Sequence, residues 1–170
     1  MRMVIMGVSG CGKSSVGIAL ARALGARFID GDDLHPLANK TKMAAGIPLD
    51  DDDRWPWLDL VGSELADDCL ESIDGSEGFT GTVIACSALK RKYRERILTA
   101  APGTLFVHLD GPKELLAERM GSRGDHFMPL ALLDSQLKTL EPLGSDEPGK
   151  VYSIELTVPQ LVTSILEQQT

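Results

Sequence analysis

The sequence Gly7-Val8-Ser9-Gly10-Cys11-Gly12-Lys13-Ser14 lies between a short apolar run, residues 3–6, and a helical pattern, residues 13–24. It matches G-x-x-x-x-G-K-[S/T] in full and has the strand-to-helix setting that this pattern requires. Glycines let the backbone curl so that successive N–H groups converge on an anion, and the helix start adds a positive dipole end. The stretch therefore predicts a phosphate-binding loop, called the phosphate loop below.

Each position of the phosphate loop has an expected role toward a nucleotide. Lys13 is expected to reach the β- and γ-phosphate oxygens, and the Ser14 hydroxyl is expected to bind Mg²⁺. Cys11 occupies a free position of the pattern, either as a small filler or as a redox-sensitive thiol. The loop predicts ATP binding but leaves the reaction open. The residues expected to contact the nucleotide here are Gly7, Val8, Ser9, Gly10, Cys11, Gly12, Lys13, Ser14 and Ser15.

The rest of the chain alternates short apolar runs with helical patterns. This layout is typical of a three-layer α/β fold, a parallel sheet with helices on both faces. The pattern leaves the order of the strands undetermined. Further strands are expected at residues 27–29, 82–86, 104–109 and 151–154, and helices at 37–45, 54–73, 88–100, 112–121, 129–140 and 159–168.

Composition limits the classes of function. A chain of 170 residues that is 43% hydrophobic can bury one core, so one domain over residues 1–170 is expected. A net charge of −8 argues against a nucleic-acid or membrane-surface binder. Three cysteines without a C-x-x-C pair suggest neither a disulfide framework nor a zinc site. No apolar run has the length of a membrane span and no export signal is recognised, so the cytoplasm is the expected compartment.

Carboxylates follow the second predicted strand, in the sequence Asp30-Gly31-Asp32-Asp33. In an extended segment Asp30 and Asp32 would point the same way. One could organise the Mg²⁺ shell while the other accepts the proton of an attacking hydroxyl. An exposed acidic turn is the alternative, which the phosphate loop beside it disfavours.

A polar, glycine-rich stretch at residues 121–128 is expected to form a lid over the phosphates. Arg119 and Arg123 lie four residues apart, so one helix face could present both to the nucleotide. There they would neutralise charge on the transferred group and exclude water, and Arg123 is the candidate catalytic residue of the pair. A solvated surface is the competing interpretation of both arginines.

Four further polar clusters resemble one family, the gluconate kinases (gluconokinases). They are DDLHP at residues 32–36, DDDRWPWL at 51–58, CSALK at 86–90 and GDHF at 124–127. The family patterns are D-G-D-x-L-H-P, L-x-D-D-D-R-x-P-W-L, C-S-A-L-K and G-H-F, and the last carries Asp125 here as an insertion. With Asn39, Lys40, Lys42, Met43, Gln136 and residues 139–142, the resemblance covers about residues 4–150.

The resemblance implies the reaction ATP + D-gluconate → ADP + 6-phosphogluconate, a fold like the nucleoside-monophosphate kinases, and a homodimer. It implies that Asp32 orients and deprotonates the 6-hydroxyl, which leaves Asp30 as the candidate Mg²⁺ ligand beside Ser14. His35 and Arg54 are implied acceptor-binding residues, and the planar guanidinium of Arg54 suits an anion. Further implied contacts to the carboxylate or the moving phosphoryl group come from Lys90, Arg94 and His126.

These residues also have simpler interpretations. Residues 51–53 could be a solvated helix start, and Trp55 and Trp57 could be packing residues. The basic residues between 90 and 96 could be a solvated face, with Lys90 the least suited to that role.

Other nucleotide-binding classes stay open to different degrees. A shikimate kinase should carry a Gly-Gly-Gly turn, and this chain has no Gly-Gly pair. An adenylylsulfate kinase and a non-catalytic nucleotide sensor remain alternatives. A GTPase should show Asn-Lys-x-Asp, whereas the nearest sequence, residues 39–42, reads Asn-Lys-Thr-Lys.

Overall fold

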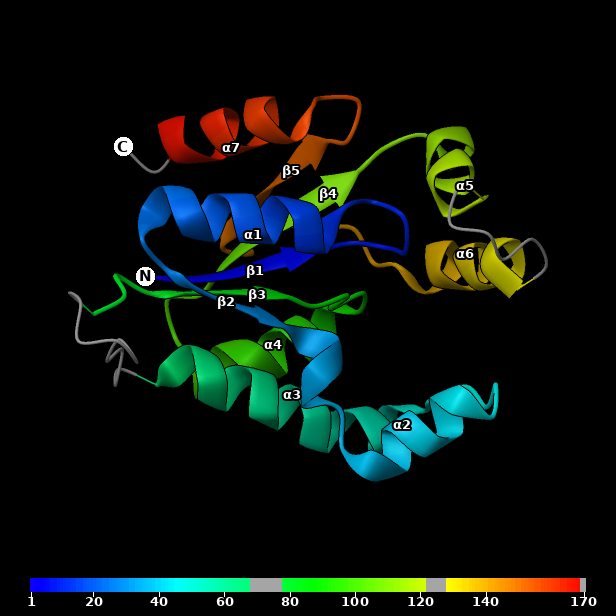
Figure 1. Cartoon of the computed structure of the whole chain (residues 1–170). Coiled ribbons are helices and arrows are strands. Elements are labelled where there is room, and N and C mark those ends of the chain that lie inside the picture. Colours follow the sequence, from blue (N-terminus) through cyan, green and yellow to red (C-terminus); the bar gives the residue numbers. More distant parts are fainter. Residues whose placement is uncertain (68–77, 122–127, 169–170) are drawn as a thin grey trace.

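The computed structural model describes residues 1–67, 78–121 and 128–168. In this part of the chain five parallel strands form one sheet in the order β2-β3-β1-β4-β5 (Figure 1). The predicted parallel sheet is confirmed, and the structure supplies the order that the sequence left open. The strands are β1 (Arg2–Met6), β2 (Arg27–Asp30), β3 (Thr82–Ala85), β4 (Leu105–Asp110) and β5 (Gly149–Ser153).

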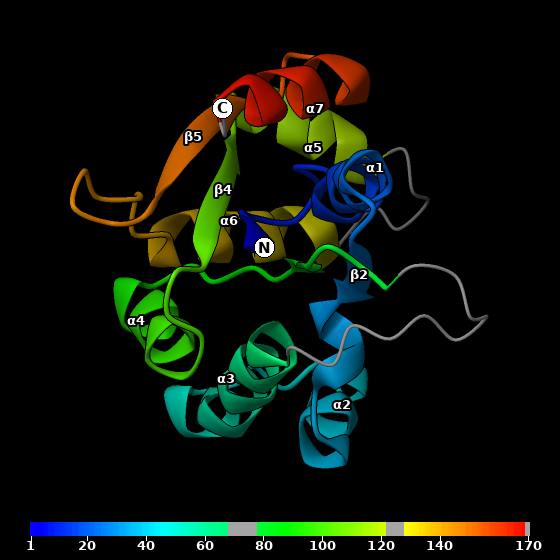
Figure 2. The same ribbon diagram turned by 90° about the vertical axis from the view of Figure 1, so that its left-hand side faces the viewer.

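Helices cover both faces of the sheet, which confirms the three-layer prediction. Helices α1 (Lys13–Leu24) and α7 (Val158–Glu167) lie on one face, and α3 (Asp51–Ala66) and α4 (Arg91–Ala100) lie on the other (Figures 1 and 2). Side chains of β1 alternate between two cores: Met3 and Ile5 pack under α1 and α7, while Val4 and Met6 pack under α3 and α4. A strand buried on both faces explains why residues 3–6 are all apolar.

The remaining elements lie beyond the carboxyl ends of the strands, where ligands bind in open α/β sheets (Figure 1). They are the 3₁₀ turn η1 (Gly31–Leu34), α2 (Leu37–Ala44), α5 (Lys113–Gly121) and α6 (Met128–Thr139). The predicted lid falls almost entirely on residues 122–127, which lie outside the described part of the chain. None of the described helices is both long and apolar enough to cross a bilayer.

Several predicted helix boundaries were wrong. Helix α3 begins at Asp51 because Asp50 and Asp53 form a reciprocal capping box, each carboxylate accepting the other's backbone N–H (2.8 and 3.1 Å). It ends at Ala66, before the predicted residue 73. The basic helix begins at Arg91, and the expected first residue Ala88 instead has φ = +43°, outside the helical region.

Arg94 lies inside the protein, where it links separate segments of the chain. Its side chain is fully buried, and its Nε and Nη2 donate to the two carboxylate oxygens of Glu147 (2.6 and 2.8 Å). Its Nη1 donates to the carbonyls of Ala88, Leu89 and Glu141 (3.1, 3.3 and 3.1 Å). These bonds tie α4 to the segments before and after it. The placement contradicts the expected contact between Arg94 and an acceptor, because the guanidinium is enclosed and engaged.

Replacing Arg94 tests this structural role. The change Arg94→Met leaves Glu147 as a buried charge without its partner, so the free energy of unfolding should fall by about 3–5 kcal/mol in urea titrations. Arg96→Met on the same helix is the matched control. Arg96 pairs with Asp59 on the surface, with both side chains about half exposed (48% and 49%), so its loss should be much smaller. Equal losses for the two variants would contradict this account.

The pH dependence of the same pair has a definite sign. The Arg94 guanidinium holds the pKa of Glu147 below its ordinary value of 4.5. The stability from this pair is therefore present above pH 4.5 and is lost as the pH falls through the lowered pKa. The difference between the wild type and Arg94→Met should shrink over that acid range.

Candidate active site

The phosphate loop follows β1 and packs tightly against neighbouring backbone. Gly7 has φ = +140°, and a Cβ there would lie 2.6 Å from the Leu109 carbonyl oxygen. Gly10 has φ = +83°, and its Cβ would lie 2.9 Å from the carbonyl oxygen of Leu116. Both positions require glycine because other residues would be strained and would clash. The loop is thereby held against β4 and α5.

The loop leads directly into α1, whose N-cap is Gly12, with a left-handed backbone and no side-chain cap. The N–H groups of the first turn have no partner inside a helix, so this end is suited to an anion. Lys13 lies half-buried along the loop and donates from Nζ to the Val8 carbonyl (3.0 Å). The structure thus brings the expected lysine, the helix start and the loop backbone together.

Two side chains of the loop point into the core. Val8 and Cys11 are 3% and 1% exposed, so only their backbone can face a bound phosphate. Burial raises the pKa of the Cys11 thiol above its ordinary value, which keeps it protonated and unreactive. Between the two interpretations of Cys11, the structure therefore favours the small filler.

The acidic segment lies beside the start of α1. The Ser14 hydroxyl donates to Asp30 Oδ2 (3.0 Å), while Asp30 Oδ1 accepts the backbone N–H of Asp32 (3.1 Å). Two oxygen ligands of one octahedral Mg²⁺, each at 2.0–2.1 Å, would be about 3 Å apart. The spacing and the oxygen chemistry of Ser14 and Asp30 therefore fit the metal expected from the sequence.

Asp32 lies in the 3₁₀ turn η1 and not in the extended segment expected from the sequence. Asp30 caps this turn, which explains the local fold. The Asp32 side chain is accessible, yet surrounding protein displaces part of its hydration and raises its pKa above 3.8. The charge of Asp30 raises this pKa further, while Lys13 opposes the shift. Asp32 is therefore a better proton acceptor than a free aspartate.

His35 lies between η1 and α2 and is buried on the indole of Trp57. The two rings are stacked, with centroids 4.1 Å apart and planes 16° apart. Trp57 Nε1 donates to the Gly31 carbonyl (2.7 Å), which fixes the indole. Burial, and then the charges of Arg54 and Lys40, lower the pKa of His35 to about 4. The ring is therefore neutral near pH 7.

Two expected acceptor-binding cations gather around one ring at the starts of α3 and α4. The Arg54 guanidinium carbon and Lys90 Nζ lie 5.7 and 5.5 Å from the centre of the Tyr93 ring. The Tyr93 hydroxyl and Lys92 both contact Asp51, which Lys90 also reaches at 3.1 Å. Arg54 and Lys90 thus both lie against the Tyr93 ring, and cations at the starts of α3 and α4 are groups that can bind a carboxylate.

The predicted lid residues are only partly visible. Arg119, at the end of α5, is half-buried and donates from Nη2 to the Ile154 carbonyl (2.7 Å). Its charge acts on Cys11, so it lies near the phosphate loop. Arg123 and His126 lie outside the described residues, and their expected roles remain predictions.

Two polar residues received no role from the sequence. Gln136, on α6, accepts the backbone N–H of Ser9 at Oε1 (2.6 Å), which ties the loop to α6. Asn39, on α2, is 2% exposed and contacts His35 and the Asp53 carbonyl. Both were counted in the family resemblance, Asn39 within residues 39–43 and Gln136 as a single position, and that match was the signal that could have found them.

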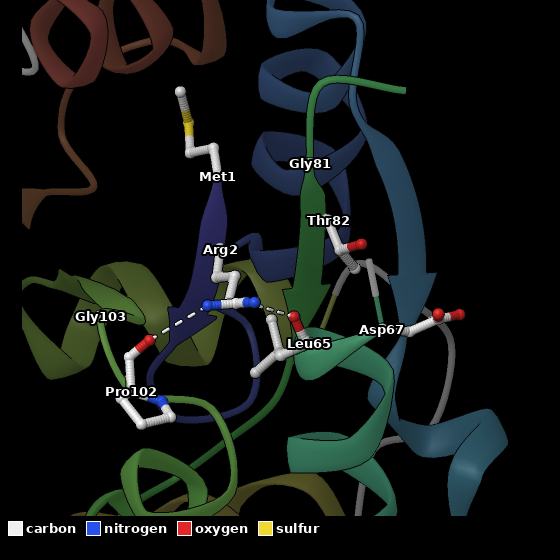
Figure 3. Close-up of a pocket in the computed structure, with 8 residues that line it drawn as sticks. All are labelled: Met1, Arg2, Leu65, Asp67, Gly81, Thr82, Pro102 and Gly103. Carbon is white, nitrogen blue, oxygen red and sulfur yellow. Dashed lines mark hydrogen bonds between the residues drawn. The ribbon is translucent and has the colours of Figure 1, made fainter. Parts of the chain in front are cut away.

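The structure also contains a pocket of about 320 Å³ away from this chemistry (Figure 3). It lies where β1 and β3 begin, at the opposite ends of these strands from the phosphate loop. Arg2 crosses it and donates to the carbonyls of Leu65 and Pro102 (2.8 and 3.2 Å). The lining residues are Met1, Arg2, Leu65, Asp67, Gly81, Thr82, Pro102 and Gly103.

Comparison with solved structures separates fold from family. The shikimate kinase of Aquifex aeolicus vf5 superposes with a TM-score of 0.59 over 99% of this chain and 96% of that one, at 18% identity. It shows the shared nucleoside-monophosphate-kinase-like fold alone. A gluconokinase of Sinorhizobium meliloti 1021 superposes with a TM-score of 0.84 at 46% identity, over 98% and 89% of the two chains.

Sequence comparisons agree with the closer of these structures. Residues 3–143 match the AAA domain family AAA_33. The chain is 44% identical over 183 positions to a probable gluconokinase of Xenopus tropicalis, covering 97% of this chain and 91% of the relative. It is 48% identical over 146 positions to a gluconokinase of Gluconobacter oxydans (strain 621H), covering 86% and 78%. The chain belongs to the gluconokinase family.

Proposed function

We propose that this chain transfers the γ-phosphoryl group of ATP to D-gluconate and releases ADP and 6-phosphogluconate. One contact carries the proposal: the 3.0 Å hydrogen bond between Ser14 and Asp30, which joins the phosphate loop to the acidic segment. A phosphate site beside a carboxylate that can accept a proton is what transfer to a hydroxyl requires. Membership of the gluconokinase family selects gluconate among the hydroxyl acceptors.

The nucleotide binds through the phosphate loop and the first turn of α1. Lys13 leaves its contact with the Val8 carbonyl, or extends from it, to pair with the β- and γ-phosphate oxygens. Ser15 follows Ser14 on the exposed first turn and adds a backbone donor. Arg119 and Arg123 supply positive charge from the other side, with Arg123 next to the group in transfer.

Ser14 and Asp30 hold Mg²⁺. When bound, the ion neutralises negative charge on the phosphate oxygens. The protein contributes the two oxygen ligands and their fixed spacing.

The acceptor binds with its two ends in different surroundings. Arg54 and Lys90 hold the carboxylate, which leaves the hydroxyl at the far end of the acceptor to reach the acidic segment. Asp32 orients that hydroxyl and accepts its proton as the oxygen attacks the γ-phosphorus. His35 contacts the chain of hydroxyl groups between them, and His126 contributes from the lid.

The proposal includes three features of the whole protein. Residues 1–170 form one domain whose lid, at about residues 121–128, closes over the phosphates. Two copies form a homodimer. The enzyme acts in the cytoplasm, on a small-molecule substrate and without nucleic-acid or membrane partners.

An acceptor panel tests the function. ADP release is followed with Mg-ATP and gluconate, other sugar acids, neutral sugars, shikimate, adenylylsulfate or nucleoside monophosphates. Turnover on gluconate that disappears in Lys13→Ala supports the proposal. Turnover on another acceptor alone would keep the kinase and reject gluconate, and ATP binding without any turnover would indicate a nucleotide sensor.

Replacing Asp32 tests the proton acceptor. Asp32→Asn keeps the size of the side chain and removes its basicity, so kcat should fall by about 10²–10⁴ while the KM for ATP stays near wild type. Asp33→Asn is the control on the same turn and should retain most of kcat. A weaker affinity for gluconate with unchanged kcat would instead assign Asp32 to positioning.

Replacing Gln136 tests the link between α6 and the phosphate loop. Gln136→Leu removes the acceptor of the Ser9 N–H, so the loop is less well ordered before ATP binds. The KM for ATP should rise about three- to tenfold, as expected for one hydrogen bond, with little change for gluconate. Ser135→Ala, an exposed neighbour on α6, should leave both values unchanged. An unchanged KM for ATP in Gln136→Leu would show that the contact has no role in nucleotide binding.

A further inference from the structure

The plane of the His35 imidazole is fixed by the protein core. His35 is 8% exposed and stacks on Trp57. The indole is itself held by its bond to the Gly31 carbonyl and by its place in the core under α3. Stacking on a held indole therefore restricts the imidazole to this plane.

Asn39 determines which ring nitrogen carries the proton. Asn39 Nδ2 lies 2.8 Å from the Asp53 carbonyl oxygen, and a carbonyl only accepts hydrogen bonds. This contact identifies the atom as the amide nitrogen and not the amide oxygen. The same nitrogen lies 3.2 Å from His35 Nδ1. Because an amide NH₂ only donates, Nδ1 must be the acceptor, and the single ring proton is on Nε2.

The surroundings of the ring also set its charge. Burial is the main reason that the pKa of His35 is lowered, and the charges of Arg54 on α3 and Lys40 on α2 disfavour imidazolium further. Asp53 meets Asn39 through its main chain, while its carboxylate is paired with Lys42 (2.7 Å). His35 Nε2 has no hydrogen-bond partner in the described part of the chain. His35 is thus a neutral ring with one unused donor.

We propose that Asn39 is a positioning residue that holds His35 as the neutral Nε2–H tautomer, so that His35 donates to a hydroxyl oxygen of the acceptor. The inference rests on the proposed function and assigns different parts of the acceptor to different residues. Arg54 and Lys90 bind the charged end of the acceptor, whereas a neutral, rigid donor recognises one hydroxyl along its chain. A site with a fixed donor disfavours acceptors that lack the matching oxygen, because the donor is then left unpaired.

Nitrogen-15 NMR of the full-length protein reads the tautomer directly. The chain has three histidines, and His35→Phe assigns the signal of His35. The wild type should show Nε2–H and bare Nδ1 from about pH 5 to 8. Asn39→Asp places an acceptor at Nδ1, so the proton should move to Nδ1 and imidazolium should persist to higher pH. An Nδ1–H tautomer in the wild type, or titration of His35 near 6.5, would overturn the inference.

Deoxygluconates, each lacking one hydroxyl, locate the acceptor oxygen. His35→Phe keeps an aromatic ring on Trp57 but loses the donor. With the wild type, one deoxygluconate should have a lower kcat/KM than gluconate because the His35 donor is left unpaired. This loss should be about three- to tenfold larger than the loss measured for the same pair of substrates with His35→Phe, which has no donor. Thr41→Val, an exposed change on α2, should behave as the wild type. If Asn39→Asp does not fold, the tautomer read in the wild type and this comparison together decide.

The outcomes separate this inference from the proposed function. Turnover of gluconate with the same deoxygluconate penalties in the wild type and His35→Phe overturns the role of His35 and leaves the kinase assignment intact. No turnover of gluconate by the wild type overturns the proposed function, and the hydroxyl contact with it.

Discussion

The hydrogen bond between Ser14 and Asp30 depends on the order of the strands, and the site depends on this bond. In the order β2-β3-β1, helix α1 crosses over β3 to connect β1 with β2. The ends of the three strands are joined at backbone level: the Gly7 N–H donates to the Ser87 carbonyl (3.3 Å), and Gly31 lies against the Ala85 carbonyl. The phosphate loop and the acidic segment are therefore positioned by the sheet.

This constraint places acids beside a site for a highly negative ligand. Asp30 and Asp32 would repel a nucleotide if nothing compensated them, in a chain that already carries a net charge of −8. Lys13 and the first turn of α1 act in the opposite direction, and Mg²⁺ on Ser14 and Asp30 would convert one of the two acids into a ligand. The remaining acid, Asp32, has its pKa raised by lost hydration and by Asp30. Lost hydration, the larger cause, thus keeps Asp32 more basic than a free aspartate.

The residues expected to bind the acceptor are held by packed aromatic side chains. Trp57 belongs to the core under α3 and also carries His35, while Tyr93 carries Arg54 and Lys90 at the start of α4. The simpler interpretation of Trp57 as a packing residue is therefore correct, yet its packing fixes a residue of the site. Asp51, expected only as a helix start, holds α4 through Lys90, Lys92 and Tyr93.

Local signals in the sequence were enough for much of the fold. Helix α1 has the predicted bounds because glycine precedes and follows it, and both of these glycines have a left-handed backbone. The role of Arg94 could not be predicted, because its partner Glu147 is 53 residues away and the neighbouring basic residues are mostly on the surface. The strand order and the pairing of Asn39 with His35 likewise depend on contacts between distant segments. The chemical role of a residue was predictable where its motif is contiguous in the sequence. The contacts that support these residues could not be predicted.

The most direct test of the central claim is a crystal structure with gluconate, Mg²⁺ and a non-hydrolysable ATP analogue. The account predicts the terminal hydroxyl of gluconate about 2.6–3.2 Å from an Asp32 oxygen and facing the γ-phosphorus, with the carboxylate at Arg54 and Lys90. A gluconate bound in the reverse direction, or a terminal hydroxyl that Asp32 does not reach, would contradict it.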